Sequence, residues 1–90
     1  MKVAVIGDGG WGTALALTLR RNGHVPCVWG PDAAYIGEIR RTRRNRKFLP
    51  GVELPEDLAW TAEAAEALDG AEAVAVVVPS KYMRAVLEGS

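Results

Sequence analysis

The chain has 90 residues, of which 49% are hydrophobic and 24% charged, and its 11 basic side chains balance 11 acidic ones. This composition is typical of one globular domain and excludes intrinsic disorder and collagen-like repeats. The zero net charge removes the whole-molecule argument for binding nucleic acid or an anionic membrane. The longest strongly apolar run, residues 73–79, is far shorter than the roughly 20 residues that a membrane-spanning helix needs.

The first third of the chain predicts a strand, a helix and a second strand. Residues 2–6 (KVAVI) are short, β-branched and almost wholly apolar, as is typical of a buried parallel strand. Residues 13–21 place apolar side chains on one broad helical face, and an Asn-Gly pair after them predicts the end of the helix. Residues 24–29 predict a second strand that ends at a Gly-Pro pair.

The middle of the chain predicts a second helix, an irregular connection and a third strand. Asp32 has the side chain of a helix N-cap, and apolar residues follow it at the spacing of one helical face. Residues 43–55 contain two prolines and show no clean period, so they predict an irregular connection. Residues 58–61 predict a short third strand.

The last third predicts a helix, a fourth strand and a final helix. Thr61 is the expected N-cap of an alanine- and glutamate-rich helix that ends at Gly70. Residues 73–78 (AVAVVV) carry the strongest strand signal in the chain, and Ser80 is the expected N-cap of a last helix.

Strands and helices therefore alternate along the whole chain. This alternation implies right-handed crossovers and a parallel sheet with helices on both faces. The expected fold class is α/β, a doubly wound parallel sheet of about four strands in the order 3-2-1-4. No linker or internal repeat divides the chain.

A glycine-rich hexapeptide joins the first strand to the first helix. Residues 7–12 (GDGGWG) match the pattern G-x-G-x-x-G. A buried strand is predicted directly before them and a helix directly after them, which is the context in which this pattern indicates dinucleotide binding. Gly7 permits a tight turn, Gly9 lets a pyrophosphate approach the backbone, and Gly12 lets the helix pack closely on the strand. The free N–H groups and the positive dipole end of the helix favour a phosphate pair. The context favours a Rossmann-type dinucleotide site over a merely structural turn.

One part of the dinucleotide fingerprint is missing. An acidic residue at the end of the second strand normally accepts the ribose hydroxyls of NAD. Residues 28–31 (VWGP) occupy that end, Asp32 comes slightly late, and no arginine is present for the 2′-phosphate of NADP. The choice between NAD and NADP therefore stays open. Asp8 places a carboxylate beside the expected phosphate site, and we expect it to weaken pyrophosphate binding.

Other chemistry-bearing residues predict neither a catalytic nor a metal site. The basic run of residues 40–47 (RRTRRNRK) has no interleaved aromatics and no second basic surface, which favours a solvated helix end over a phosphate or nucleic-acid patch. His24, the only histidine, has no nearby partner in the sequence. Cys27, the only cysteine, is expected to be a buried small hydrophobe; it excludes an internal disulfide and favours a reducing, cytoplasmic setting.

Several segments together resemble one enzyme family. These are VIG-x-G-x-WGTALA at residues 5–16, RNGH at 21–24, VWG at 28–30, N-x-x-FLPG at 45–51 and VVPS at 77–80. Their spacing resembles that of the NAD(P)-dependent glycerol-3-phosphate dehydrogenases of the bacterial type. The tryptophan in the glycine loop and the N-x-x-FLPG stretch are much more specific than the glycines alone, and the resemblance covers essentially all 90 residues.

The resemblance implies a cofactor, NAD or NADP, and a set of residues that contact it. Trp11 and Gly10 would contact the cofactor, Phe48 would lie close to the nucleotide, and Ser80 and Tyr82 would lie along its central part. Gly10 replaces a frequent serine or asparagine of the family, and Pro31 replaces histidine, arginine or an aromatic. The expected cofactor-binding residues are Gly7, Gly9, Gly10, Trp11, Gly12, Pro31, Phe48, Ser80 and Tyr82.

The family implies reversible hydride transfer between NAD(P)H and dihydroxyacetone phosphate, which yields sn-glycerol 3-phosphate for phospholipid synthesis. Family members are much longer and carry their catalytic lysine in a helical C-terminal domain. Residues 1–90 are therefore expected to be the N-terminal part of the dinucleotide-binding domain, able to bind nucleotide weakly without turnover. The phosphorylated substrate would bind only to the full-length protein.

The sequence is also compatible with two other functions, and it predicts one mode of assembly. The chain could be a non-catalytic dinucleotide-binding module, or the N-terminal part of another NAD(P)-dependent dehydrogenase that acts on hydroxyacids or nucleotide sugars. The uncharged fourth strand, residues 73–78, predicts a homo-oligomer or self-association through an exposed sheet edge.

Overall fold

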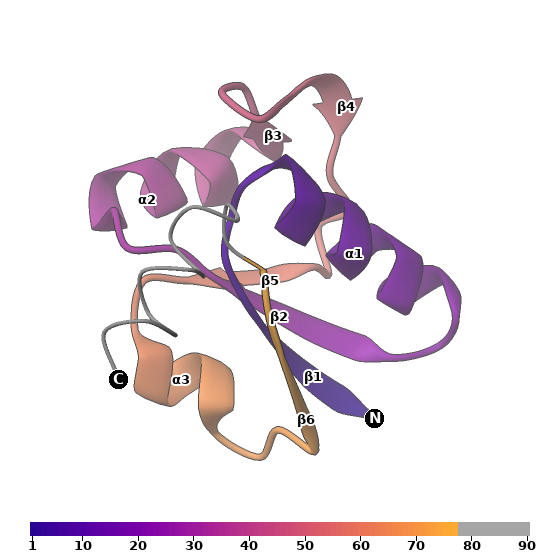
Figure 1. The fold of residues 1–90 in the computed structure, drawn as a ribbon. Coiled ribbons are helices and arrows are strands. Elements are labelled where there is room, and N and C mark those ends of the chain that lie inside the picture. Colours follow the sequence, from indigo (N-terminus) through magenta and orange to yellow (C-terminus); the bar gives the residue numbers. More distant parts are fainter. Residues whose placement is uncertain (78–90) are drawn as a thin grey trace, which may run out of the picture.

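The computed structural model describes residues 1–77, in which strands and helices alternate as the sequence predicts except at residues 44–61, where three strands follow one another (Figure 1). The expectations for Val78, Ser80, Tyr82 and the last helix lie outside these residues. The elements are β1 (Lys2–Ile6), α1 (Gly10–Arg21), β2 (Val25–Trp29), α2 (Ala33–Thr42), β3 (Arg44–Asn45), β4 (Leu49–Glu53), β5 (Ala59–Thr61), α3 (Ala64–Leu68) and β6 (Ala73–Val76).

The main sheet has four parallel strands in the order β5-β2-β1-β6. Among the four strands predicted from the sequence this is the order 3-2-1-4, so the expected doubly wound α/β sheet is confirmed. Since β1 lies inside the sheet, the loop that follows it is flanked by both neighbouring strands. All four strands end at the same edge, where ligands bind in sheets of this kind.

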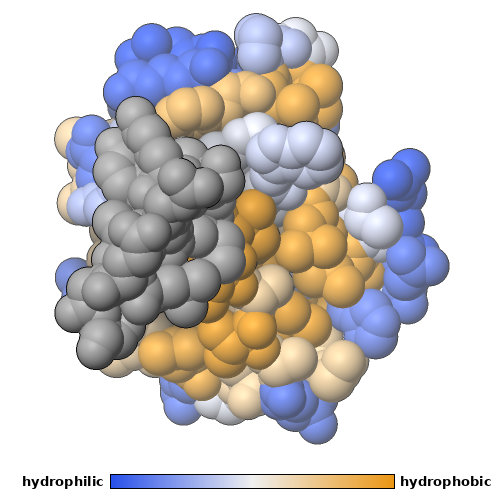
Figure 2. Space-filling model, in the orientation of Figure 1, coloured by the Kyte–Doolittle hydropathy of each residue, from blue (hydrophilic) through white to orange (hydrophobic). Residues whose placement is uncertain are grey.

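Helices cover both faces of the sheet, but unequally. In Figure 1, α1 and α2 lie on one side of the sheet and α3 lies on the other. On the α3 side, Val74 and Val76 of β6 are 53% and 57% exposed. Figure 2 shows hydrophobic residues gathered where β6 crosses the front of the molecule. Part of this sheet face is therefore left open by the described residues.

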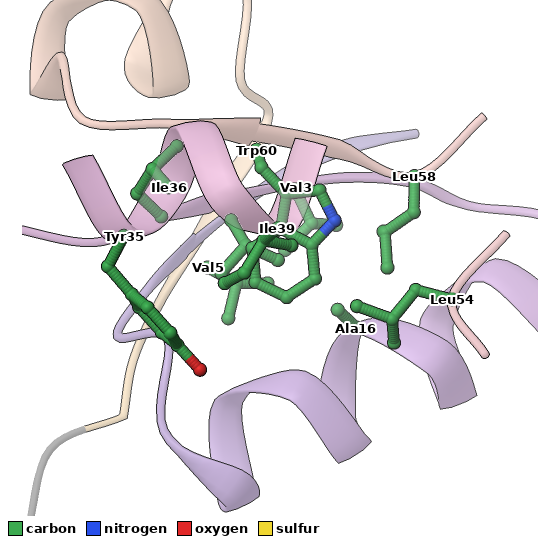
Figure 3. Packing of buried hydrophobic residues seen from close by; sticks show 10 residues of the cluster. Val3, Val5, Ala16, Tyr35, Ile36, Ile39, Leu54, Leu58 and Trp60 are labelled. Atoms are coloured by element: carbon green, nitrogen blue, oxygen red, sulfur yellow. The ribbon is translucent and has the colours of Figure 1, made fainter. Parts of the chain in front are cut away.

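The principal core lies between the sheet and the helices α1 and α2 (Figure 3). Alternate strand residues face opposite sides of a sheet, so β1 contributes Val3 and Val5 to this core and Ala4 to the other face. The smaller cluster, on the α3 side, contains Ala4, Cys27 and Ala67. The principal core consists of Val3, Val5, Ala16, Val28, Tyr35, Ile36, Ile39, Leu54, Leu58 and Trp60.

The connection between α2 and β5 is not irregular, as the sequence predicted, but contains a hairpin. Strands β3 and β4 pair antiparallel, with Arg44 opposite Glu53 and Asn45 opposite Leu49 and an irregular register between them. The prediction was wrong because β3 has only two residues and β4 is mostly exposed, so neither shows an alternating pattern. The hairpin is held instead by Leu54, which is buried immediately after β4.

Helix starts also differ from the sequence prediction at two places. Helix α1 begins at Gly10, three residues before the expected start. Helix α3 begins at Ala64, and the Thr61 hydroxyl does not cap it but accepts the Glu63 N–H at 3.0 Å. Asp32 is confirmed as the N-cap of α2, because its carboxylate accepts the Tyr35 N–H at 3.1 Å.

Candidate functional site

The glycine loop at the end of β1 combines two crowded positions with one open position. Gly7 has a φ of 135°, and a Cβ atom there would overlap the Val77 carbonyl group. A Cβ atom at Gly12 would overlap the Gly7 carbonyl group. Both positions therefore exclude a side chain. Gly9 differs, since a Cβ atom there would meet nothing within 4 Å.

The N-terminus of α1 opens onto the same space. Its N-cap is Gly9, which makes no side-chain capping bond, and the first turn contains no acidic residue. The Thr13 N–H donates to the carbonyl of the N-cap residue Gly9 at 2.9 Å and so closes the first turn of the helix. The earlier N–H groups of a helix have no intrahelical acceptor and favour an anion. The open space at Gly9 and the uncapped helix start fit the two phosphates of a dinucleotide.

A buried asparagine, which sequence reasoning missed, fixes the glycine loop. Asn45 of β3 is 0% exposed. Its side-chain amide donates to the Asp8 carbonyl at 2.7 Å and to the Thr13 hydroxyl at 2.9 Å. The Tyr35 hydroxyl donates to the Asn45 side-chain oxygen and accepts the Lys47 N–H at 3.1 Å. The network ties the hairpin to the glycine loop, to α1 and to α2.

The hairpin also brings an aromatic side chain to the loop. A Cβ atom at Gly10 would lie 3.0 Å from the Phe48 carbonyl oxygen, so the two predicted site residues are neighbours. The Phe48 ring is half-exposed and meets the Tyr35 ring edge-on, with centroids 6.4 Å apart. Trp11, in the first turn of α1, is 85% exposed. Two exposed aromatic side chains, Trp11 and Phe48, therefore lie beside the glycine loop.

The end of β2 lies against the side chain of Asp8. A Cβ atom at Gly30 would overlap the Asp8 carboxylate and would lie 2.9 Å from the Ile36 side chain. Burial raises the pKa of Asp8, its own backbone N–H lowers it, and the negative charge of Asp32 raises it further. Pro31 follows Gly30 and is exposed. The carboxylate of the glycine loop therefore occupies the place where a side chain of residue 30 would begin.

The remaining predicted site residues fall in two groups. The structure gathers the glycines of residues 7–12, Trp11 and Phe48 at one edge of the sheet, with Pro31 just after β2. Ser80 and Tyr82 lie outside the described residues. Within residues 1–77, no cluster of three or more His, Cys, Asp and Glu side chains could hold a metal ion. The same part of the chain contains no helix that is long and apolar enough to cross a membrane.

The other polar residues singled out in the sequence lie in structural positions. Cys27 is buried, as expected, and burial raises the pKa of its thiol. His24 lies in the turn before β2, at the opposite end of that strand from Gly30. In the basic run, the Arg43 guanidinium donates to the Leu58 carbonyl at 3.0 Å, and Arg46 pairs with a glutamate of α2 at 2.7 Å. Only residues 40–42 of the run lie in α2, whereas residues 44–47 belong to the hairpin and include the buried Asn45, so the prediction of a solvated helix end holds for the first part of the run alone.

Comparison with known proteins agrees with this geometry. Residues 2–90 match the family described as "NAD-dependent glycerol-3-phosphate dehydrogenase N-terminus". The chain is 47% identical over 87 residues to a glycerol-3-phosphate dehydrogenase (NAD(P)+) of Bacillus velezensis, covering 97% of this chain and 25% of that protein. The corresponding protein of Anaeromyxobacter dehalogenans is 46% identical, with 97% and 26% covered.

Solved structures of the same enzyme have the same fold. The glycerol-3-phosphate dehydrogenase of Coxiella burnetii matches with a TM-score of 0.80 and 34% identity, over 88% of this chain and 24% of that one. The Saccharomyces cerevisiae enzyme reaches a TM-score of 0.80 at 22% identity, over 99% of this chain and 29% of that one, which supports the fold alone. The chain spans about a quarter of the length of the curated relatives it matches. Because the family match extends over residues 2–90, the chain belongs to the NAD-dependent glycerol-3-phosphate dehydrogenase family and corresponds to its N-terminal part.

Proposed function

We propose that residues 1–90 are the N-terminal part of a dinucleotide-binding domain that holds NAD or NADP. The observation that carries this proposal is the loop geometry. Gly7 and Gly12 are packed too closely for any side chain, whereas Gly9 faces open space at an uncapped helix start. This combination is what a pyrophosphate needs, because only bare backbone can approach it closely and donate N–H groups to it.

Each part of the site has a binding role in this proposal. The backbone at Gly9 and Gly10 receives the phosphates, and Trp11 and Phe48 offer aromatic surface to the nucleotide. The end of β2 and Pro31 lie beside the adenosine ribose, while Ser80 and Tyr82 would contact the central part of the cofactor. When bound, the nicotinamide ring supplies or accepts a hydride. The residues of this chain bind and orient the cofactor.

The full-length protein, in the same proposal, interconverts dihydroxyacetone phosphate and sn-glycerol 3-phosphate in the cytoplasm, for phospholipid synthesis. The similarity to glycerol-3-phosphate dehydrogenases supports the reaction, and the single buried cysteine supports the reducing location. Since the chain spans about a quarter of those relatives, the catalytic groups and the site for the phosphorylated substrate would belong to the helical C-terminal domain. We therefore expect the 90-residue chain to bind the cofactor without turnover.

Binding of NADH to the purified 90-residue chain tests the proposal. Protein-detected NMR titration remains quantitative for weak ligands, and we expect a Kd in the millimolar to high-micromolar range, about 4–6 kcal/mol. The amide signals of the glycine loop should shift most. Reduction of dihydroxyacetone phosphate by this chain above background would contradict the assignment of catalysis to the helical C-terminal domain.

A pair of glycine substitutions separates binding from folding. Gly9→Ala places a methyl group in the open space of the loop, and we expect it to weaken NADH binding about tenfold without loss of stability. Gly37→Ala is the matched control, because a Cβ atom there also meets nothing within 4 Å, on an exposed face of α2. Equal NADH affinity in the two variants would contradict the proposed phosphate site.

A further inference from the structure

The end of β2 lacks any side chain able to accept a hydrogen bond from a ribose hydroxyl. The Trp29 indole N–H is a donor and is already bonded to the Ala62 carbonyl at 3.0 Å. Gly30 has no side chain, and the ring of Pro31 carries no polar group. A Rossmann-type site for NAD normally carries its ribose-binding carboxylate at this point. The next carboxylate along the chain, Asp32, caps α2 by accepting the Tyr35 N–H at 3.1 Å, so a ribose-binding carboxylate at the end of β2 must come from elsewhere in the fold.

The Asp8 side chain occupies the vacant position. Its carboxylate lies where the Cβ atom of residue 30 would be, so the glycine at this point makes room for it. The backbone of Asp8 is held in place because its carbonyl oxygen accepts the Asn45 side-chain amide at 2.7 Å. The glycine loop thus brings the Asp8 carboxylate to the end of β2, beside Gly30. Asp8 precedes Gly30 by 22 positions in the chain.

The charges around this position favour a ribose diol over a ribose phosphate. Asp32 adds a second carboxylate near Asp8, and Lys47 is the opposing cation. The Lys47 ammonium lies over the Tyr35 ring, 4.6 Å from its centroid. A carboxylate accepts hydrogen bonds from both ribose hydroxyls, whereas it repels the 2′-phosphate of NADP.

We infer that Asp8 substitutes for the missing acid of β2, binds the adenosine ribose and makes this domain selective for NAD over NADP. The inference rests on the proposed function, since it assigns one part of the proposed cofactor site. It also reverses the sign expected from the sequence, which placed the Asp8 carboxylate beside the pyrophosphate. Asp8 in this position assists NAD binding.

Titration of the 90-residue chain with NADH and with NADPH tests this assignment. The wild type should bind NADH about tenfold more tightly than NADPH, a difference equivalent to one well-placed charge. Asp8→Asn keeps the shape and removes the charge, so it should weaken NADH binding, strengthen NADPH binding and bring the ratio of the two Kd values close to one. Asp8→Ser is a second variant with the same expected loss of selectivity.

Asp57→Asn is the matched control, because it removes the same charge from an exposed residue that pairs with Arg20 near the other end of α1. It should leave the ratio of the Kd values unchanged. A wild type that prefers NADPH, or a ratio unaffected by both Asp8 substitutions, would overturn the assignment of Asp8 and leave the proposed function intact. A wild type that binds neither nucleotide would contradict the proposed function and the ribose assignment with it.

Discussion

The ionised Asp8 side chain lowers the stability of the fold, although we infer that it binds the cofactor. Its carboxylate is partly buried beside Gly30, and burial is the main reason that its pKa is raised. Asp32 raises the pKa further, while Lys47 lowers it. The ionised form is therefore less stable in the folded protein than in the unfolded chain. Residues that bind ligands often destabilise a fold in this way.

The pH dependence of stability follows from the raised pKa of Asp8. Protonation favours the folded state, so the contribution of Asp8 to stability is fully present below its unfolded pKa and is lost as the pH rises through its folded pKa. Asp8→Asn removes the titrating group. We expect this variant to be more stable than the wild type at pH 7, by less than about 1 kcal/mol because solvent screens the half-exposed group. Urea unfolding at pH 7 and in strong acid measures the difference, which should vanish in acid.

Asp57 provides a control of opposite sign. A hydrogen bond from Arg20 holds the pKa of Asp57 below its usual range, so the ion pair contributes stability above the unfolded pKa and loses it as the pH falls. Asp57→Asn should therefore lower stability at pH 7 and leave it unchanged in strong acid. A pH-independent effect of Asp8→Asn would contradict the burial of its charge.

Among the elements, the hairpin of β3 and β4 depends most on contacts outside itself. A two-stranded hairpin alone is marginally stable in water. Here its anchor points are the buried side chains of Asn45 and Leu54, and the Leu54 N–H donates to the Arg43 carbonyl at 2.8 Å. Because Asn45 also bonds the glycine loop, the hairpin and the cofactor site are held by the same network.

Removing the Asn45 amide should disturb both stability and binding. Asn45→Ala removes the amide donor to the Thr13 hydroxyl and the acceptor of the Tyr35 hydroxyl proton, and we expect a loss of about 1–3 kcal/mol in the free energy of unfolding. The glycine loop loses its fixed position, so NADH binding should also weaken in the NMR titration.

Arg46→Ala is the control within the same hairpin, since Arg46 is exposed, pairs with Glu38 and lies over the Tyr35 ring at 6.0 Å from its centroid, at the edge of the network. It should leave stability and NADH binding nearly unchanged. If Asn45→Ala lowered stability but left NADH affinity and the loop signals as in the wild type, Asn45 would hold the hairpin without positioning the site.

At the scale of the whole molecule, the two faces of the sheet are covered unequally. Val74 and Val76 pair in register with Ala4 and Ile6, so they lie on the face that α3 covers only in part. Within residues 1–77, β6 is an edge strand of the sheet. An uncharged, β-branched edge beside an open apolar face is a template for pairing with another chain.

We therefore expect the 90-residue chain to self-associate through β6. Val76→Lys should reduce association, because a charge on an edge strand opposes pairing. It should cost little core stability, since Val76 is already exposed. Val25→Lys introduces the same charge at an equally exposed valine of the interior strand β2 and should reduce association less. Sedimentation velocity over a range of concentrations measures the association of each variant. A wild type that stays monomeric at high concentration would contradict self-association through β6.

The sequence by itself determined the strand and helix alternation, the parallel sheet and the glycine loop. These features depend on short-range signals: the β-branched run of β1, the Asp32 N-cap and glycines whose spacing follows from one strand-to-helix turn. Period and local backbone preference are properties of neighbouring residues, so they can be read without knowing the tertiary structure.

Only the tertiary structure decided how the site is assembled around that loop. The Asn45 amide reaches the Asp8 carbonyl across 37 positions of the chain, and the Asp8 carboxylate reaches the end of β2 over Gly30. Neither contact leaves a local pattern in the sequence, because both depend on how closely the hairpin and β2 pack against the glycine loop. The sequence therefore predicted where a dinucleotide would bind, whereas the residue now assigned to its ribose emerged from contacts between segments far apart in the chain.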